Sequence, residues 1–281
     1  MPGTLFVVAT PIGNLEDITL RALRVLSEVD LVAAEDTRRT GNLLRHYKIA
    51  TKLLSVHEHN EAARVEEVLA RLRAGKSVAL VSDAGTPGIS DPGAMLVRAV
   101  RDAGLPVAPI PGASAVTAAI SASGLDSTRF AFAGFPPFRL NARIKWLERV
   151  CTRTDEVMVF YESPHRIVQT LRDAATLLVE RPILIARELT KVHEEWLQGT
   201  ASHLADSLSA PQGEFVVLIP PVPLQDDSPT VSDRDVYVLF GQITKEGGAG
   251  RRDAVREIAA RLSMSPNAVY EAIERAKILG E

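Results

Sequence analysis

Cysteine is nearly absent from this sequence, which holds a single one, Cys151, in 281 residues. One cysteine excludes an internal disulfide and any metal site built from several cysteines. Long apolar runs are missing too, since no segment approaches the roughly 20 residues that a membrane-spanning helix needs. The first residues, MPGTLFVVATPIGN, carry no basic leader, and the apolar run at 5–9 is too short for a secretory signal peptide. We therefore expect a cytoplasmic protein with no membrane partner.

A surplus of basic charge is absent as well. Lys and Arg number 32 against 35 Asp and Glu, which gives a formal net charge of −3 at pH 7. This composition argues against wholesale binding to nucleic acid, because that needs a broad basic surface. It leaves room for local basic faces, since residues 139–153 hold five basic side chains and one acidic side chain.

Two nucleotide-binding motifs are also missing. The glycine-rich segment VSDAGTPGISDPG at 81–93 follows an apolar strand but lacks the lysine of a phosphate-binding P-loop. No G-x-G-x-x-G follows the first strand, where a dinucleotide-binding fold needs it. The segment offers backbone amides and carbonyls together with Asp83 and Asp91. Such a lining suits a zwitterionic or cationic ligand better than a polyphosphate.

What the sequence does contain is a regular alternation of strands and helices over residues 1–118. Apolar strands are predicted at 4–10, 30–36, 52–56, 77–83 and 105–110. The first helix is predicted at 17–29, with Asp17 as its N-cap. This order predicts an α/β domain with a mostly parallel sheet. Residues 119–221 have shorter links, which favour antiparallel pairing and predict an α+β domain with a mixed sheet.

The last part of the chain differs in composition. Residues 222–233 belong to a stretch rich in Pro, Ser and Asp, which predicts a linker. Residues 234–281 predict a small helical extension of the helix-turn-helix kind, with Pro266 in the first turn of its last helix. Six basic against five acidic residues over 251–281 make a weak DNA-binding surface. DNA is therefore not a predicted partner.

Five turns rich in small or polar residues follow predicted strands. They are TPIGN (10–14), AEDTR (34–38), SDAGTPGISDPG (82–93), PGASA (111–115) and AGFPP (133–137). In open α/β sheets, ligands bind outside the carboxyl ends of the strands. Any one of these segments could be a simple tight turn, but five at one sheet edge favour a ligand cleft.

Seven segments together carry a family resemblance. They are ATPIGNLEDITLRAL, AEDTRRTGNLL, HEHNE, SDAGTPGISDPG, PGASA, AGFPP and FYESPHRI. In this order, over nearly the whole chain, they resemble the ribosomal RNA ribose methyltransferases of the tetrapyrrole methylase superfamily. The resemblance implies a two-domain enzyme that binds S-adenosylmethionine in a cleft between its domains, with the small helical extension at the C-terminus.

The resemblance also implies a reaction and partners. The reaction is methyl transfer to the ribose 2′-hydroxyl of a decoding-region cytidine in 16S rRNA. The partners are 16S rRNA or the small ribosomal subunit, and a second copy of the chain in a homodimer. The superfamily's Gly-Asp-Pro signature is replaced here by Ser82-Asp83-Ala84, which leaves the role of Asp83 less defined.

The predicted cofactor-binding residues come from the turns after the strands. The backbone of residues 85–90 is expected near the methionine and methyl end of S-adenosylmethionine, and Asp91 is expected to cap the following helix. The predicted set is Pro11, Gly13, Asn14, Asp83, Gly85, Thr86, Gly88, Ile89, Ser90, Ser114, Ala115 and Tyr161.

Two charged pairs are candidates for the chemistry. A ribose hydroxyl is a poor nucleophile, so a base or a stabilising cation near it would help. Glu188 and Lys191, just beyond an apolar strand, and Asp36 and Arg38 in AEDTR could supply these groups. The alternatives are a surface i,i+3 charge pair and a structural salt bridge. Methyl transfer can also rest on alignment alone, without a dedicated base.

Basic residues in the second domain are candidates for RNA contact. Lys145, Arg149 and Arg153 are spaced by four, so they share one face of a predicted helix beside Trp146. Such side chains could hold phosphates, and an aromatic ring could stack on a splayed base. Arg166 is a further candidate for a phosphate contact. The alternatives are a solvated helix face and a tryptophan in the core.

No metal site is predicted. His57 and His59 alternate as two strand residues would, but no third ligand with clear spacing follows. We expect a substrate contact or a hydrogen-bond network at a helix start, with Asn60 as a possible cap.

Two other functions remain open from the residues alone. A tetrapyrrole methylase of the same fold would need a large trough lined with arginines, because its substrate carries many carboxylates. A DNA-binding regulator with a ligand-sensing body would use the C-terminal helices and would transfer no methyl group.

Overall fold

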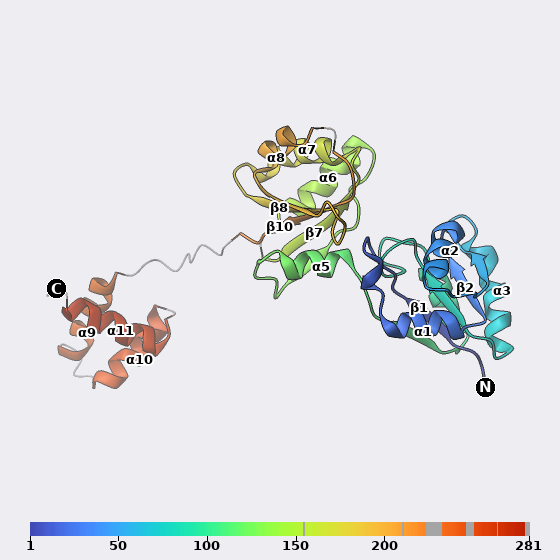
Figure 1. The fold of residues 1–281 in the computed structure, drawn as a ribbon. Coiled ribbons are helices and arrows are strands. Elements are labelled where there is room, and N and C mark those ends of the chain that lie inside the picture. The colour runs from blue at the N-terminus through green and yellow to red at the C-terminus, as the bar shows by residue number, and fades with distance from the viewer. Residues whose placement is uncertain (154, 210, 223–231, 246–249, 263, 279–281) are drawn as a thin grey trace. The chain divides into compact units, whose positions relative to one another are not determined.

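The computed structural model describes residues 1–153, 155–209, 211–222, 232–245, 250–262 and 264–278. They form two compact units, Met1–Val222 and Pro223–Glu281, which are described separately (Figure 1). Of the predicted linker at 222–233, residues 223–231 lie outside the described residues.

The first unit begins with a five-stranded parallel sheet in the order β3-β2-β4-β1-β5. Its strands are β1 (Leu5–Val8), β2 (Leu31–Ala34), β3 (Leu53–Ser55), β4 (Val78–Val81) and β5 (Val107–Ile110). The central strands β2 and β4 are buried along their whole length, as parallel strands covered on both faces must be. The predicted α/β class is confirmed for this part of the chain.

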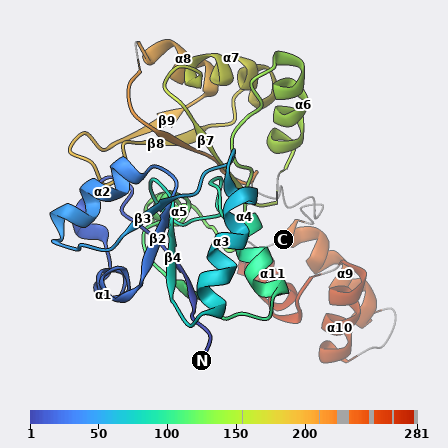
Figure 2. The same ribbon diagram turned by 90° about the vertical axis from the view of Figure 1, so that its right-hand side faces the viewer.

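Helices cover both faces of this sheet. On one face, α1 (Leu20–Glu28) and α2 (Thr37–His46) pack against Val8, Val32 and Val81. On the other, α3 (Glu61–Arg73) and α4 (Ala94–Asp102) pack against Leu5 and Leu80, and Figure 2 shows these two helices side by side. Successive side chains of each strand therefore enter opposite cores.

The first helix starts later than its sequence pattern predicts. Residues Leu15–Asp17 form a short 3₁₀ turn, in which the Asn14 side chain accepts a hydrogen bond from the backbone N–H of Glu16 at 3.1 Å. The Thr19 hydroxyl oxygen accepts from the N–H of Ala22 at 3.0 Å and so caps α1. The prediction of Asp17 as the N-cap is wrong, because the 3₁₀ turn includes this residue.

The second sheet of the same unit has the order β6-β7-β10-β8-β9. Its strands are β6 (Phe130–Phe132), β7 (Val157–Glu162), β8 (Ile183–Arg187), β9 (Glu195–Gly199) and β10 (Phe215–Ile219). The β6–β7 pair is parallel and the other pairs are antiparallel, which confirms the predicted mixed sheet. The predicted domain boundary at residue 118 lies within α5 (Ala115–Ala122), whose buried residues pack on this second sheet.

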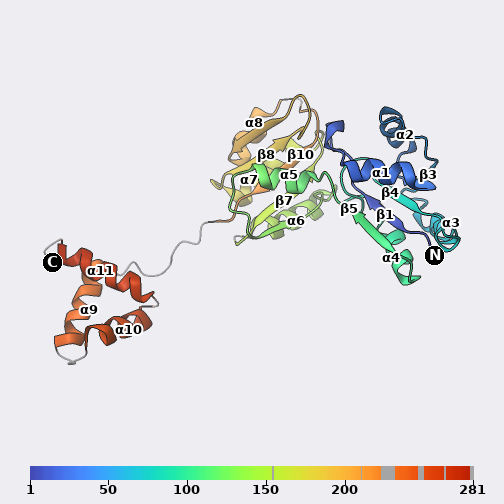
Figure 3. The ribbon, with the colours of Figure 1, turned by 60° about the horizontal axis from the view of Figure 1, so that its bottom comes forward.

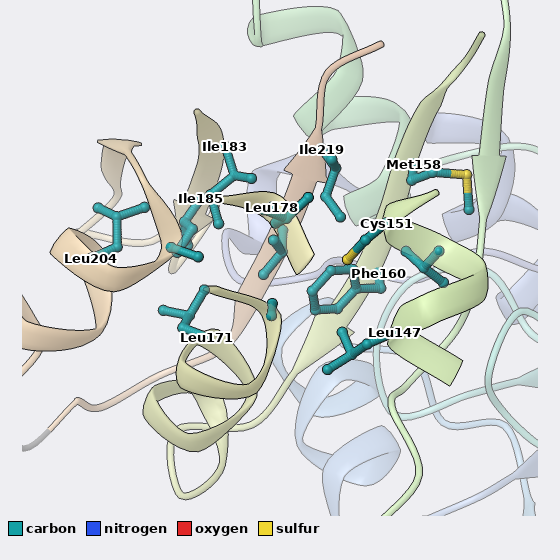
Figure 4. Packing of buried hydrophobic residues seen from close by; sticks show 14 of the residues in the cluster. Leu147, Cys151, Met158, Phe160, Leu171, Leu178, Ile183, Ile185, Leu204 and Ile219 are labelled. Atoms are coloured by element: carbon teal, nitrogen blue, oxygen red, sulfur yellow. The ribbon is translucent and has the colours of Figure 1, made fainter. Parts of the chain in front are cut away.

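Side chains alternate strictly along the strands of the second sheet, so the two faces of this sheet contribute to two separate hydrophobic cores. Val157 and Val159 face α5, whereas Met158 and Phe160 face α6 (Leu140–Cys151), α7 (Ile167–Leu178) and α8 (Ala201–Ser207). Figure 1 shows these three helices on one side of the sheet and α5 on the other. In Figure 4 the strand residues meet the buried helix residues Leu147, Cys151, Leu171, Leu178 and Leu204. Burial raises the pKa of the Cys151 thiol to about 11, so this cysteine is an inert core residue.

The second unit is a bundle of three helices, α9 (Asp233–Lys245), α10 (Arg251–Arg261) and α11 (Pro266–Ile278) (Figure 3). It has its own core, which includes Val236, Ile258 and Ile273. Pro266 opens α11, whereas α9 was not predicted as a separate helix. Within the described residues, no helix is both long and apolar enough to cross a bilayer.

Candidate functional site

The first unit contains a cavity of about 390 Å³ at the carboxyl ends of β1, β4 and β5, here called the main cavity. Its volume falls in the range of roughly 300–1,000 Å³ that is usual for small-molecule sites. Its lining comes from both sheets of the unit: Ile12, Ala84, Gly85, Thr86, Ile89, Ser90, Asp91, Ser114, Ala115, Phe135, Tyr161, Glu162, Ser163, Pro164, Glu214, Phe215 and Val216. This lining includes carboxylates and aromatic rings but no Lys, Arg or His. It suits a cationic or zwitterionic ligand with an apolar part.

The wall of the main cavity is built by the glycine-rich loop between β4 and α4. Thr10 and Gly85 exchange two backbone hydrogen bonds, of 2.8 and 3.0 Å, which join this loop to the loop after β1. Gly85 has a φ of 75°, and Gly93 has a φ of 122°. The φ of Gly93 is one that residues with a Cβ rarely adopt, and an added Cβ would also displace Leu80 Cδ2, which would lie 2.8 Å away. The Thr86 hydroxyl donates to the Ala113 carbonyl at 3.2 Å and ties the loop to the turn before α5.

Asp91 lies in this wall and lines the main cavity. The prediction that it caps the next helix is wrong, because α4 begins only at Ala94 and its N-cap position is Gly93. Burial raises the pKa of the Asp91 carboxyl to about 6. Repulsion from the carboxylates of Glu35 and Asp83 adds to the rise, while a hydrogen bond from Ser82 opposes it.

Asp83 lies next to the main cavity but does not line it. Its carboxylate accepts a hydrogen bond from the backbone N–H of Asp36 at 2.9 Å and lies 3.5 Å from Arg39 Nη1. Its own N–H donates to Glu35 Oε2 at 3.3 Å. Burial raises the pKa of Glu35 above its ordinary value, and the carboxylates of Asp83 and Asp36 add to the rise. Asp83 therefore binds the turn between β2 and α2.

Seven of the twelve predicted cofactor-binding residues line the main cavity: Gly85, Thr86, Ile89, Ser90, Ser114, Ala115 and Tyr161. Pro11 and Asp83 line a neighbouring cavity of about 380 Å³, and Gly88 lines another. The remaining two meet the turn after β8. Asn14 donates its N–H to Thr190 Oγ1 at 3.0 Å, and a Cβ on Gly13 would lie within 3.0 Å of residues 189–191.

Glu188 and Lys191 form an ion pair in the turn after β8. Lys191 Nζ lies 2.8 Å from Glu188 Oε1 and 3.0 Å from Glu214 Oε2. Burial would raise the pKa of Glu188, but hydrogen bonds from Lys191 and from the Glu214 N–H outweigh it and lower that pKa. Glu188 lines a different cavity, together with Arg187 and residues 192–195, whereas Glu214 lines the main cavity. This geometry matches the alternative interpretation of these two residues, an i,i+3 charge pair.

Asp36 and Arg38 are tied to each other at the start of α2. Asp36 accepts from the backbone N–H of Arg38 at 2.8 Å and from its guanidinium at 2.9 and 3.2 Å. These hydrogen bonds lower the pKa of Asp36 to about 2. The Arg38 side chain is 89% exposed. Neither residue lines the main cavity, so Asp36 acts as a helix cap with a surface salt bridge.

The basic residues predicted for RNA contact fall into two groups. Lys145 and Arg149 are exposed on α6. The helix ends at Cys151, so Arg153 lies beyond the shared face and pairs with Glu156 at 2.7 Å. Arg166 donates from Nη2 to the carbonyls of Pro136 and Pro137, at 2.5 and 3.1 Å, and so holds the loop after β6.

The local packing shows the roles of Trp146 and His57, for which the sequence left alternatives. Trp146 is 8% exposed and meets Phe160 edge-to-face at 5.3 Å, so it belongs to the core and cannot stack on a base. His57 lies in a local network before α3, in which Asn60 Oδ1 accepts its N–H at 2.8 Å and Asn60 Nδ2 lies 3.1 Å from its Nε2. The Asn60 side chain makes this network instead of a cap hydrogen bond to the helix.

Several residues of the main cavity were missed by the sequence analysis. Phe135 lies 5.4 Å from the ring of Tyr161, and its motif AGFPP had been noted as a turn without assigning this side chain. Glu214 and Phe215 come from the start of β10, where no motif marks them. Burial raises the pKa of the Tyr161 hydroxyl to about 12, so this group stays protonated at neutral pH.

Comparisons with known proteins agree on one family. A family model described as Tetrapyrrole (Corrin/Porphyrin) Methylases matches residues 4–205. Among curated relatives, a protein named Ribosomal RNA small subunit methyltransferase I from Synechocystis sp. is 43% identical, covering 96% of this chain and 96% of its own. A protein of the same name from Thermotoga maritima is 47% identical, covering 77% of this chain and 98% of its own.

Solved structures resemble the first unit in fold. Uroporphyrin-III C-methyltransferase from Thermus thermophilus, complexed with S-adenyl homocysteine, aligns with a TM-score of 0.56 at 19% identity, over 77% of this chain and 97% of that one. Diphthine synthase aligns with a TM-score of 0.63 at 14% identity, over 78% of this chain and 90% of that one. At these identities the likeness concerns the fold alone.

Proposed function

Because the chain belongs to the tetrapyrrole methylase family, we propose that it is an S-adenosylmethionine-dependent methyltransferase acting on 16S rRNA of the small ribosomal subunit. The observation that carries this proposal is the identity of 43% over 96% of the chain with a relative named Ribosomal RNA small subunit methyltransferase I. The finer target is the ribose 2′-hydroxyl of a decoding-region cytidine, as the motif resemblance implies.

The lining of the main cavity supports the cofactor. S-adenosylmethionine, when bound, supplies an electrophilic methyl group on a positively charged sulfur. Backbone groups of the loop at Gly85 and the turn at Ser114 would hold it, beside the rings of Phe135 and Tyr161. The cavity wall carries carboxylates and no basic side chain, which suits a cation and disfavours a ligand with many carboxylates or phosphates.

The chain's own contribution to the reaction is mainly alignment. The glycine-rich wall is tied to its neighbours by the paired hydrogen bonds between Thr10 and Gly85 and by the hydrogen bond from the Thr86 hydroxyl to the Ala113 carbonyl. A rigid wall holds the reacting groups in line, which can contribute several kcal/mol to the rate enhancement. The apolar and aromatic part of the lining would exclude water from the methyl group of the bound cofactor.

RNA contact is proposed for the exposed basic residues of α6. Lys145 and Arg149 are free to reach phosphates, since they lie on the exposed face of the helix. Arg153 is paired with Glu156 and Arg166 with backbone carbonyls, which makes them weaker candidates. We also propose a homodimer in the cytoplasm, on the resemblance to the superfamily. Analytical ultracentrifugation of the full chain tests the dimer.

The proposed function is tested by methyl transfer in vitro. The purified protein is incubated with S-adenosylmethionine labelled in its methyl group and with small ribosomal subunits, naked 16S rRNA or uroporphyrinogen III. We expect label only in rRNA, and mass spectrometry of nuclease digests should find a 2′-O-methylated cytidine. Label in the tetrapyrrole, or none in rRNA in either form, would overturn the proposal.

A further inference from the structure

Three carboxylates line the main cavity, and their partners differ. Glu162 is 2% exposed, its Oε2 lies 3.5 Å from Arg166 Nη2, and it accepts hydrogen bonds from the Thr170 hydroxyl at 2.6 Å and the Ser163 N–H at 2.8 Å. Glu214 lies 3.0 Å from the Lys191 ammonium. Asp91 has no ion-pair partner among the residues that the structure describes. It is the cavity carboxylate whose charge is left uncompensated.

The groups around Asp91 make it more basic than an ordinary carboxylate. It is half-buried and lies near Glu35 at the end of β2 and Asp83 after β4, both of which repel its charge. Arg39 of α2 lies 3.5 Å from Asp83 and pairs with that residue. Burial and these repulsions raise the pKa of Asp91 to about 6, against the opposing hydrogen bond from Ser82. A group of this kind is ionised at pH 7 and accepts a proton readily.

The backbone around Asp91 keeps it in the cavity wall. Ser90, immediately before it, has a φ of 62°, a left-handed conformation that costs free energy for a residue other than glycine. Gly93, two residues later, delays the start of α4. Tyr161 of β7 lines the same cavity. Burial raises the pKa of its hydroxyl, and the negative charges of Asp91 and Glu214 raise it further. Strained backbone that places a side chain in a cavity is a common feature of functional sites.

We propose that Asp91 is the general base of the methyl transfer, accepting the proton of the attacking ribose 2′-hydroxyl. This assignment rests on the proposed function. The 2′-oxygen forms the new bond to the methyl carbon with one of its lone pairs, while the carbon–sulfur bond breaks and leaves its electron pair on sulfur. The 2′-oxygen proton passes to a carboxylate oxygen of Asp91. The resulting carboxylic acid then releases this proton to water.

This assignment replaces Glu188 as the candidate base. The Glu188 carboxylate is held by Lys191 at 2.8 Å and by the Glu214 N–H at 3.0 Å, both of which stabilise its charged form. It also lies outside the main cavity. Protonation of Asp91, by contrast, removes a charge that Glu35 and Asp83 repel.

The test compares Asp91→Asn with Asp91→Glu and with Asp206→Asn, an exposed aspartate of α8 outside the main cavity. Steady-state methylation of small subunits gives kcat and KM between pH 5 and 9, and calorimetry gives the affinity for S-adenosylhomocysteine. We expect Asp91→Asn to lower kcat about 100-fold or more with an affinity for S-adenosylhomocysteine within threefold of wild type. Asp91→Glu should recover part of the rate, and Asp206→Asn should match wild type.

Two further measurements separate a base from a structural residue. The wild-type kcat/KM, which reports the free enzyme, should rise with pH through an apparent pKa near 6, and Glu35→Gln should move this limb to lower pH because it removes a neighbouring negative charge. Carbon-13 NMR of labelled aspartate should show a carboxyl titrating near pH 6 that Asp91→Asn removes. This second measurement needs no activity.

The outcomes are distinguishable. If Asp91→Asn keeps kcat within threefold of wild type, or loses activity only through weaker binding of S-adenosylhomocysteine, Asp91 is not the base. If wild-type protein methylates no rRNA, the proposed function fails, and the NMR titration still reports whether Asp91 has the required proton affinity. A titration near pH 4 would contradict the inference by itself.

Discussion

Two loops of the first unit, the glycine-rich wall at 82–93 and the turn at 188–191, are alike in backbone and opposite in electrostatics. Each follows a strand, and each holds a residue other than glycine at positive φ: Ser90 at 62° in the wall and Glu188 at 52° in the turn. The turn compensates its carboxylate with Lys191, whereas the wall leaves Asp91 among other carboxylates. Backbone strain therefore marks both loops, and the surrounding charges decide which carboxylate can act as a base.

The largest effect is expected from filling the main cavity. Gly85→Val places a branched side chain at a φ of 75° beside Ile12, whose Cγ2 would lie 3.4 Å from the new Cβ. We expect calorimetry to show an affinity for S-adenosylhomocysteine at least 30-fold weaker, about 2 kcal/mol. Gly104→Val is the matched control, because Gly104 has a φ of 68° and open space around it. If both variants bind alike, the main cavity is not the cofactor site and the comparison fails.

The second effect is a stability change that depends on pH. The pKa of Asp91 is higher in the folded protein, about 6 against 3.8, so its ionisation destabilises the fold as pH rises through 6. Asp91→Asn should therefore raise the free energy of unfolding by about 1–3 kcal/mol at pH 8 and change little below pH 4. Urea denaturation at both pH values measures this.

Glu188→Gln should behave in the opposite way. Its pKa is lowered in the folded protein, so its stabilising contribution is present above pH 4.5 and disappears as pH falls through the folded value. The variant should be less stable than wild type at pH 7 and equal to it at the acid end. Equal responses of the two variants would show that the loops are not electrostatic opposites.

A smaller effect is expected from removing the cation of the turn. Lys191→Met leaves Glu188 and Glu214 close together without their ammonium and should lower the free energy of unfolding at pH 7 by about 1 kcal/mol. In the Glu188→Gln background the same change should cost less, giving a coupling energy of about 0.5 kcal/mol. Lys145→Met on the exposed face of α6 controls for loss of a lysine, and urea titrations measure wild type and the four variants.

The smallest effect concerns the strain itself. Ser90→Gly should change the free energy of unfolding by no more than about 0.5–1 kcal/mol in the stabilising direction, because relief of the positive φ is offset by a more flexible unfolded chain. Thr190→Gly relieves a φ of 66° but removes the hydroxyl that accepts from Asn14, so it should destabilise by about 1 kcal/mol. Thermal unfolding of the two variants measures how much the hydrogen bond to the Thr190 hydroxyl stabilises the turn.

Local patterns were enough to predict the fold class and seven of the seventeen residues that line the main cavity. The alternation of strands and helices gave the parallel sheet, and the glycine-rich turns after the strands pointed to residues such as Gly85 and Ser114 that line the main cavity. These features depend on short-range propensities and on the rule that strand ends gather at one edge.

Features that depend on where an element ends, or on distant pairing, were out of reach. Asp91 in SDPG has the sequence of a helix cap, but Gly93, with a φ of 122°, takes the N-cap position and α4 begins only at Ala94. Arg153 continues a spacing of four past the last residue of α6. Glu214 reaches the cavity because β10 pairs with β7 and β8, a long-range arrangement that no local motif encodes.

The paired hydrogen bonds between Thr10 and Gly85 join the loop after β1 to the glycine-rich wall, so these two loops of the cavity open together. Both amides are used within the bridge, and the loop after β1 continues to Asn14, which donates to Thr190 in the turn after β8. The wall cannot open without loosening this series of contacts, so its amide protons should exchange with solvent together with those of the turn. The loop with the uncompensated carboxylate is thus coupled to the loop whose carboxylate is compensated, and a ligand that orders one slows the local unfolding of the other.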